Sequence, residues 1–193
     1  MNIAVLGGTF DPPHFGHLLV ARQVLEHVSG VDEVSLLPAN TNPDKTVFAS
    51  AKDRLAMTNL LKESGISISD MDIARGGETY TIDTIHELLK DTKNTYLWVM
   101  GSDLLTQMNH WQKHEEIISS IPFIIFPRPG FSTTDAPKNA TILSENKLLT
   151  ANYSATAIRG RVAKGLSIKG LVPDGVAEYI EKNKLYQSKS VYV

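Results

Sequence analysis

The 193-residue chain contains no cysteine. This absence excludes disulfide scaffolds, Cys-ligated zinc, iron–sulfur clusters and thiol nucleophiles. The sequence also lacks any apolar run near the roughly 20 residues that cross a bilayer. It opens with Asn2 and a short apolar run rather than a basic leader region. We therefore expect no membrane partner and a cytoplasmic location.

An excess of charge of either sign is lacking too, since 19 Lys and Arg stand against 21 Asp and Glu, a net charge of −2. A surface that binds duplex nucleic acid needs clustered Lys and Arg to displace counterions. We therefore expect no nucleic-acid partner, whereas a small anionic ligand is compatible with this balance. Composition leaves the oligomeric state open, a homo-oligomer included.

Short apolar runs typical of buried strands alternate with segments whose apolar residues recur at helical spacing. The expected strands cover residues 3–6, 34–37, 66–73, 96–100 and 123–126. The expected helices cover residues 18–28, 50–62, 82–89, 154–163 and 174–180. The alternation predicts an α/β fold with a doubly wound, mostly parallel sheet covered by helices on both faces.

Residues 128–140 are rich in Pro, Gly, Ser and Thr and read as a linker that could close over a ligand. With 42% apolar residues the chain can bury one substantial core. We expect a single domain over residues 1–193, in which 1–150 form the α/β core and 151–193 a small helical lobe. In such sheets ligands bind outside the carboxyl ends of the strands, which directs attention to the loops after Leu6, Leu37 and Met100.

The densest group of chemically useful residues is Gly-Gly-Thr-Phe-Asp-Pro-Pro-His-Phe-Gly-His at positions 7–17, between the first strand and the first helix. A helix N-terminus exposes unpaired N–H groups that carry about half a positive charge and attract anions. His14 and His17 can project together toward a phosphate, whose charge raises the share of imidazolium. Alternatively, the glycines only turn the chain and the histidines pack or form half of a metal site. No dinucleotide fingerprint and no P-loop is present.

The run Gly-Gly-Thr-Phe-Asp-Pro-x-His-x-Gly-His resembles the signature of the nucleotidyltransferases, and in this form it resembles bacterial nicotinate-mononucleotide adenylyltransferases. The similarity continues in order through residues 77–84, 101–103 with 111, 128–130 and 154–159. It implies a Rossmann-like fold and an enzyme of NAD biosynthesis that joins ATP and nicotinate mononucleotide to give deamido-NAD and pyrophosphate. Attack on the α-phosphate would be in line, without a covalent intermediate, so catalysis would rest on positioning and charge neutralisation.

The resemblance also implies roles for individual residues. His14 and His17 would be catalytic, with His17 donating to the α-phosphate in the transition state. The implied ATP-binding residues are Gly8, Thr9, Phe10, His14, Gly16, His17, Asp103, Ser154, Ile158 and Arg159. The implied mononucleotide-binding residues are Lys45, Thr79, Tyr80, Thr81 and Trp111. Mg²⁺ would arrive on the ATP phosphates, since the sequence offers no dedicated metal ligands.

Each implied role has a simpler structural alternative. Ser154 and Arg159 would grip the β- and γ-phosphates, or serve as an ordinary N-cap and a solvated cation. Asp103 would accept ribose hydroxyls, or cap a helix. Trp111 would stack on the pyridinium ring, a cation–π contact worth about 0.5–2 kcal/mol, or belong to the core. Lys45 would contact phosphate, or be solvated.

The acceptor side leaves further questions open. Backbone N–H groups around Tyr80 and Thr81 would bind the nicotinate carboxylate, and Thr79 or Thr81 would cap the helix that follows. Asp44 stands where the family usually has a His, which puts the phosphate role of that loop in question. Nicotinamide mononucleotide stays an alternative acceptor; the Thr-Tyr-Thr run with Trp111 argues against phosphopantetheine. A non-catalytic nucleotide sensor is a further alternative that Asp44 keeps open.

Overall fold

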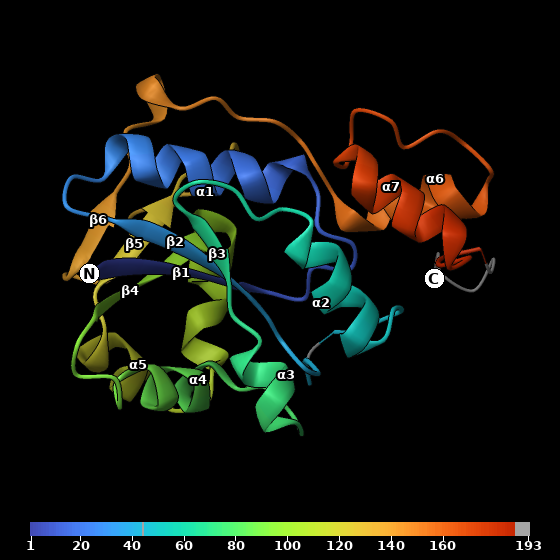
Figure 1. Ribbon diagram of the computed structural model, residues 1–193. Helices are drawn as coiled ribbons and strands as arrows, with labels where there is room; N and C mark the ends of the chain where they lie inside the picture. Colours follow the sequence, from blue (N-terminus) through green and yellow to red (C-terminus); the bar gives the residue numbers. More distant parts are fainter. Residues whose placement is uncertain (44, 188–193) are drawn as a thin grey trace.

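The computed structural model describes residues 1–43 and 45–187. Its centre is a six-stranded sheet with the order β3-β2-β1-β4-β5-β6 (Figure 1), and all five strand pairs are parallel. The strands are β1 (Asn2–Gly8), β2 (Glu33–Pro38), β3 (Ile66–Ile68), β4 (Thr95–Gly101), β5 (Phe123–Phe126) and β6 (Ala140–Ile142). The prediction of a doubly wound parallel sheet is confirmed, and the strand order reverses beside β1.

Seven α-helices surround the sheet within the described residues. They are α1 (Phe15–His27), α2 (Ala51–Asn59), α3 (Met71–Arg75), α4 (Thr81–Leu88), α5 (His114–Ser120), α6 (Ala155–Ala163) and α7 (Asp174–Lys182). Two 3₁₀ segments complete the structure, η1 (Ser102–His110) and η2 (Glu145–Lys147). In Figure 1, α1 covers one face of the sheet, α4 and α5 cover the other, and α6 and α7 lie together beyond the sheet's edge. No helix in residues 1–43 or 45–187 is long and apolar enough to span a membrane.

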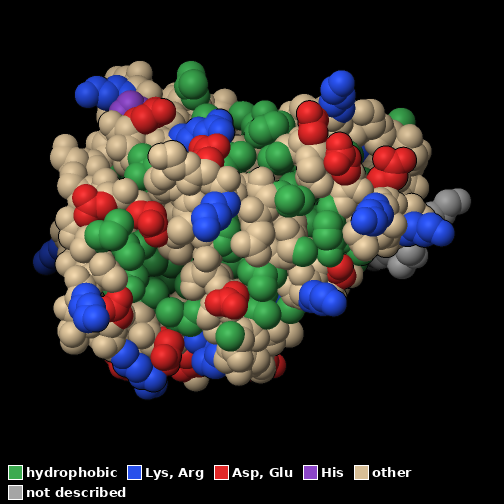
Figure 2. Space-filling model, viewed as in Figure 1, with side chains coloured by type: hydrophobic (Ala, Val, Ile, Leu, Met, Phe, Trp, Pro, Cys, Tyr) green, Lys and Arg blue, Asp and Glu red, His purple; other side chains and the backbone are tan. Residues whose placement is uncertain are grey.

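The core consists of two apolar clusters, one on each face of the sheet. Successive residues of β1 divide between them, because Ala4 belongs to the cluster under α1 and Val5 to the cluster over α4 and α5. Val176 and Ile180 of α7 belong to the first cluster, so the C-terminal helices pack into the same core as the sheet. The division of the chain into a 1–150 core and a 151–193 lobe stays a prediction. Figure 2 shows acidic and basic side chains interspersed over the face of the molecule that it presents.

Two predicted helix starts have the expected caps. The Ser50 hydroxyl accepts a hydrogen bond from the Asp53 N–H at 3.1 Å, and the Ser154 hydroxyl accepts one from the Ala157 N–H at 3.3 Å. Each bond satisfies a backbone donor that the first turn of a helix leaves without an intrahelical partner. The first cap marks the start of α2. This helix ends at Asn59, whereas the sequence predicted an end near residue 62.

Three expectations about the strands and helices are wrong. The strand predicted over 66–73 ends at Ile68, and Met71–Arg75 forms α3. The helical turn lets Arg75 reach the buried Asp72 carboxylate at 2.8 Å, three residues earlier. The helix predicted over 82–89 ends at Leu88, so Leu89 lies beyond α4 and is 45% exposed rather than part of its apolar face. The short edge strand β6 falls at the end of the predicted linker, where its three residues give too little pattern to detect.

Candidate active site

The turn after β1 brings the first catalytic candidates to the carboxyl edge of the sheet. The backbone passes so close to neighbouring rings that side chains are excluded at two positions. A Cβ on Gly7 would lie 2.9 Å from the Trp98 ring, and a Cβ on Gly16 would lie 2.9 Å from the His14 ring. Glycine at position 16 therefore lets the His14 imidazole lie against the first turn of α1.

His14 and His17 form a stacked pair at the start of α1, with ring centroids 3.9 Å apart. The ring of Phe10, a buried residue with a φ of 49°, lies 4.6 Å from the ring of His17. The His14 N–H donates to Nδ1 of His17 at 3.1 Å. Because Nδ1 is the acceptor, a neutral His17 carries its proton on Nε2, which remains available as a donor.

The protein around the histidines favours their neutral forms. Burial lowers the pKa of His14 from 6.5 to about 4, and the nearby Arg128 charge adds to this effect. Desolvation, then His14 and Arg128, hold the pKa of His17 well below its usual value. The protein alone therefore gives neutral imidazoles at pH 7, and the expected rise in the share of imidazolium beside a phosphate stays a prediction. A bound anion would oppose these shifts.

The buried Asp11 links the turn to the C-terminal helices. Its carboxylate accepts hydrogen bonds from the N–H groups of Phe48 (2.7 Å) and Ala49 (3.1 Å) and from the Tyr186 hydroxyl (2.7 Å). Its carbonyl accepts a hydrogen bond from Nη1 of Arg159 at 2.7 Å. In the described part of the chain, the buried Nε of Arg159 has no hydrogen-bond partner. The structure thus brings α6 and the turn before α1 into one cluster.

A cavity of about 420 Å³ lies beside this cluster. Its walls are His14 and Gly16 at the start of α1, the loop after β5 and the segment that leads into α6. The Tyr153 ring, next to the α6 N-cap, lies 6.1 Å from the His14 ring. The first histidine and the chain entering α6 therefore border one space, whereas His17, Ser154 and Arg159 are not among the described residues that line it.

Arg128 is the residue that the sequence-based site most clearly missed. It follows β5 and lines the cavity, and its Nε lies 3.0 Å from Oδ1 of Asp103. Its N–H donates to the Ser102 hydroxyl at 2.9 Å. A Cβ on Gly101 would lie only 2.7 Å from the Arg128 Nε, so glycine is needed for this approach. The sequence signal that could have identified Arg128 is the Arg-Pro-Gly run at 128–130, which is part of the family resemblance. Asp103 is thus ion-paired, and the N-cap of η1 is Gly101 rather than Asp103.

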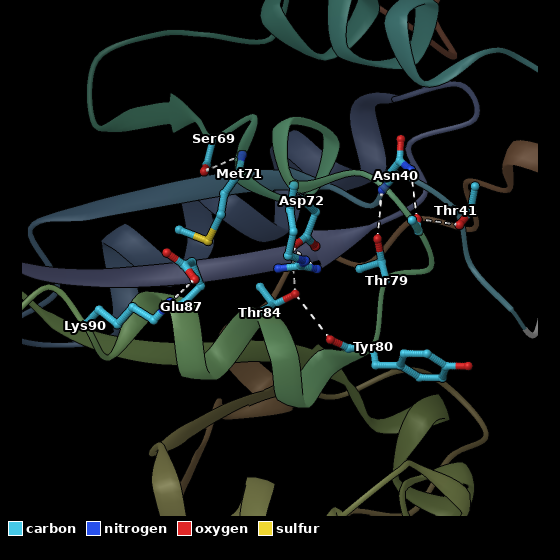
Figure 3. Close-up of polar contacts among 12 residues, drawn as sticks. Asn40, Thr41, Ser69, Met71, Asp72, Thr79, Tyr80, Thr84, Glu87 and Lys90 are labelled. Atoms are coloured by element: carbon cyan, nitrogen blue, oxygen red, sulfur yellow. Dashed lines mark hydrogen bonds and ion pairs between the residues drawn. The ribbon is translucent and has the colours of Figure 1, made fainter.

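The loop after β2 is tied to the segment before α4, as Figure 3 shows. The Asn40 N–H donates to the Thr79 hydroxyl at 3.0 Å, and the Asn40 side chain donates to the Gly77 carbonyl at 2.8 Å. The N-cap of α4 is Tyr80, not Thr79 or Thr81. Thr79 therefore holds the neighbouring loop, and Figure 3 shows the Tyr80 ring extending away from α4.

Arg54 of α2 braces the loops at the ends of β1 and β2. This fully buried guanidinium donates to the carbonyls of Thr9 (2.8 Å), Ala39 (2.5 Å) and Asn40. Because these three carbonyls belong to two different loops, their relative position is fixed by one side chain. No sequence pattern predicts this role, since an Arg inside an amphipathic helix is usually solvated.

Three further predicted residues differ in their burial. Ile158 is buried in the first apolar cluster, whereas Trp111 is partly buried against the second. Lys45 is exposed, with its N–H bonded to the Asn42 carbonyl at 3.2 Å. Asp44 lies outside the described residues. Among the described residues, no group of three or more His, Asp and Glu side chains could hold a metal ion.

Comparison with known proteins adds the family context. Residues 5–161 match the cytidylyltransferase-like family model. Two curated relatives bear the name "Probable nicotinate-nucleotide adenylyltransferase". The one from Bordetella avium is 37% identical over 96% of this chain and 98% of its own length. The one from Streptomyces coelicolor is 40% identical over 95% of this chain and 100% of its own.

A solved structure shares the fold. The nicotinic acid mononucleotide adenylyltransferase of Plasmodium falciparum, complexed with NaAD, superposes with a TM-score of 0.81. The match covers 96% of this chain and 97% of that chain, at 22% sequence identity. At this identity the likeness shows the Rossmann-like nucleotidyltransferase fold alone.

Proposed function

The chain belongs to the cytidylyltransferase-like family and, within it, to the nicotinate-nucleotide adenylyltransferases; from this premise we propose that it joins ATP to nicotinate mononucleotide, giving deamido-NAD and pyrophosphate. One observation carries the proposal. His14 and Gly16 at the start of α1 border one cavity with Arg128 and the chain that leads into α6, and Arg159 of α6 bonds to the Asp11 carbonyl in the turn before α1. The N-terminus of α1, the segment that enters α6 and the Arg128 guanidinium around one space suit a polyphosphate.

The proposed chemistry is a phosphoryl-type transfer. A phosphate oxygen of the mononucleotide attacks the α-phosphorus of ATP, the new P–O bond forms, and the bond to the β-phosphate oxygen breaks as pyrophosphate leaves. The protein would hold the reactants in line and stabilise the charge on the α-phosphate oxygens. Nε2–H of His17 is the donor best suited to this task, because its Nδ1 already accepts the His14 N–H.

The other phosphates would lie toward α6 and the loop after β5. The Arg159 Nε has no partner within residues 1–43 and 45–187, and an anionic oxygen would satisfy it. The Ser154 hydroxyl and the first N–H groups of α6 would add donors, as would Arg128 at the cavity wall. Mg²⁺ prefers oxygen ligands and usually keeps several waters, so it would be held by the phosphates rather than by a protein cage.

The acceptor would occupy the loops after β2 and before α4. The N–H groups at the start of α4, around Tyr80 and Thr81, would bind the nicotinate carboxylate. Trp111 would stack on the pyridinium ring, and Lys45 would approach the mononucleotide phosphate. Asp103 would accept ribose hydroxyls while it is paired with Arg128.

The deciding experiment measures pyrophosphate released from ATP with three acceptors in parallel: nicotinate mononucleotide, nicotinamide mononucleotide and phosphopantetheine. We expect the highest kcat/KM with nicotinate mononucleotide, because its carboxylate can bind the N–H groups of α4. Faster turnover with either other acceptor would overturn the substrate assignment. ATP binding without pyrophosphate release from any acceptor would identify a nucleotide sensor instead.

A further inference from the structure

The last described residues after α7 return to the turn before α1. Residues 183–187 follow α7, and within them Lys184 and Tyr186 have positive φ values of 53° and 59°. Non-glycine residues keep such conformations only when the surroundings require it. Here the result is that the Tyr186 ring is buried, 6% exposed, with its hydroxyl 2.7 Å from Oδ1 of Asp11.

Tyr186 is a fixed donor to a buried anion. Burial and the Asp11 carboxylate both raise the pKa of Tyr186, so its hydroxyl stays protonated. The other two donors to the carboxylate are the backbone N–H groups of Phe48 and Ala49. Tyr186 is thus the one side-chain donor to the Asp11 carboxylate among the described hydrogen bonds, and it comes from 175 residues away.

Asp11 in turn holds Arg159 on two sides. The Asp11 carbonyl accepts from Nη1 of Arg159. The guanidinium also lies 4.4 Å over the centre of the Phe48 ring. The position of Phe48 is itself set by the bond from its N–H to the Asp11 carboxylate at 2.7 Å. A shift of the Asp11 side chain would therefore move Phe48, on whose ring Arg159 lies, while the contact with the Asp11 carbonyl depends on the main chain of the same residue.

We propose that Tyr186 is a positioning residue for the phosphate site, whose hydroxyl fixes Asp11 and through it the direction of the Arg159 guanidinium. The inference rests on the proposed function, in which Arg159 binds ATP phosphates. It assigns the end of α7 a part in ATP binding, although Tyr186 itself touches no substrate.

The test removes one oxygen atom. In Tyr186→Phe, we expect the Kd for ATP, measured by calorimetry, to rise about tenfold, within the ~100-fold that a 1 Å misplacement can cost. The KM for ATP should rise with it, while the KM for nicotinate mononucleotide stays unchanged. Tyr179→Phe is the matched control, because Tyr179 in α7 donates to Asp53 of α2 at 2.9 Å, outside the proposed site. It loses a hydrogen bond of the same type and should leave ATP binding unchanged.

A double-mutant cycle separates positioning from general stability. If the hydroxyl acts through Arg159, Tyr186→Phe should weaken ATP binding no further in an Arg159→Ala background. Additive effects, or equal changes in Kd for Tyr186→Phe and Tyr179→Phe, would overturn the proposal. Because calorimetry with ATP needs no acceptor and no turnover, this result is separate from the pyrophosphate assay. An inactive enzyme that binds ATP would refute the proposed reaction and still decide the role of Tyr186.

Discussion

The two halves of the proposed site are held in different ways. Around the turn before α1, the supporting groups are buried: Asp11, His14, Arg54 and Arg159 are all at most 9% exposed. Around the segment before α4, the bonds from Asn40 and Thr41 to the Gly77 carbonyl lie at the surface. Buried hydrogen bonds are electrostatically stronger than exposed ones. The proposed phosphate side is thus preorganised, whereas on the proposed acceptor side Arg54 anchors the loop after β2 and the segment before α4 can adjust to a ligand.

The largest expected effect follows from removing a hydrogen-bond donor on the proposed phosphate side. His17→Ala should keep the fold and lower kcat about 10²- to 10³-fold, the usual cost of losing one transition-state donor. Steady-state kinetics with ATP and nicotinate mononucleotide would measure it. His27→Ala, an exposed position at the end of the same helix, is the control and should leave kcat unchanged. An active His17→Ala enzyme would show that preorganisation here serves the fold alone.

The second effect is a pH dependence of stability. The His14 pKa is about 4 in the folded protein against 6.5 ordinarily, so between these values the unfolded chain binds the proton and the folded chain does not. Protonation of the unfolded chain therefore lowers the free energy of unfolding as the pH falls below 6.5. At pH 4 the loss is about 3 kcal/mol, and above pH 6.5 there is none. Urea unfolding of the wild type and His14→Gln at pH 7, 6 and 5 would measure it. The variant should show a shallower pH dependence, and identical slopes would contradict the burial of a neutral imidazole.

The smallest kinetic effect is expected on the proposed acceptor side. Trp111→Ala should raise the KM for nicotinate mononucleotide by about 2- to 30-fold, corresponding to the 0.5–2 kcal/mol of a cation–π contact. The KM for ATP should stay constant, because Trp111 packs on the opposite face of the sheet from the first cluster. Initial rates with each substrate varied in turn would show the difference. An equal rise for ATP would place Trp111 in the wrong half of the site.

The same contrast explains what the sequence could predict. The glycine–histidine turn and the Ser154 cap are local patterns, and the structure contains both in the expected places. The alternation of strands and helices was enough to predict the sheet. The pairing of Arg128 with Asp103 depends on neighbouring strands, and the bond from Tyr186 to Asp11 joins the two ends of the chain. No local pattern reveals such partners, because each residue alone is typical of a surface or a core.

Arg54 has a consequence for how such a protein could change its substrate. Among the described residues its guanidinium bonds to main-chain carbonyls, those of Thr9, Ala39, Asn40 and Ala49. Because these bonds involve no partner side chain, a substitution at Asn40 keeps the anchor beneath it, whereas Ala39 and Ala49 are buried and constrained by packing. A designer who wishes to graft a new acceptor specificity could therefore rewrite the loop after β2, provided that its backbone path over the arginine is preserved.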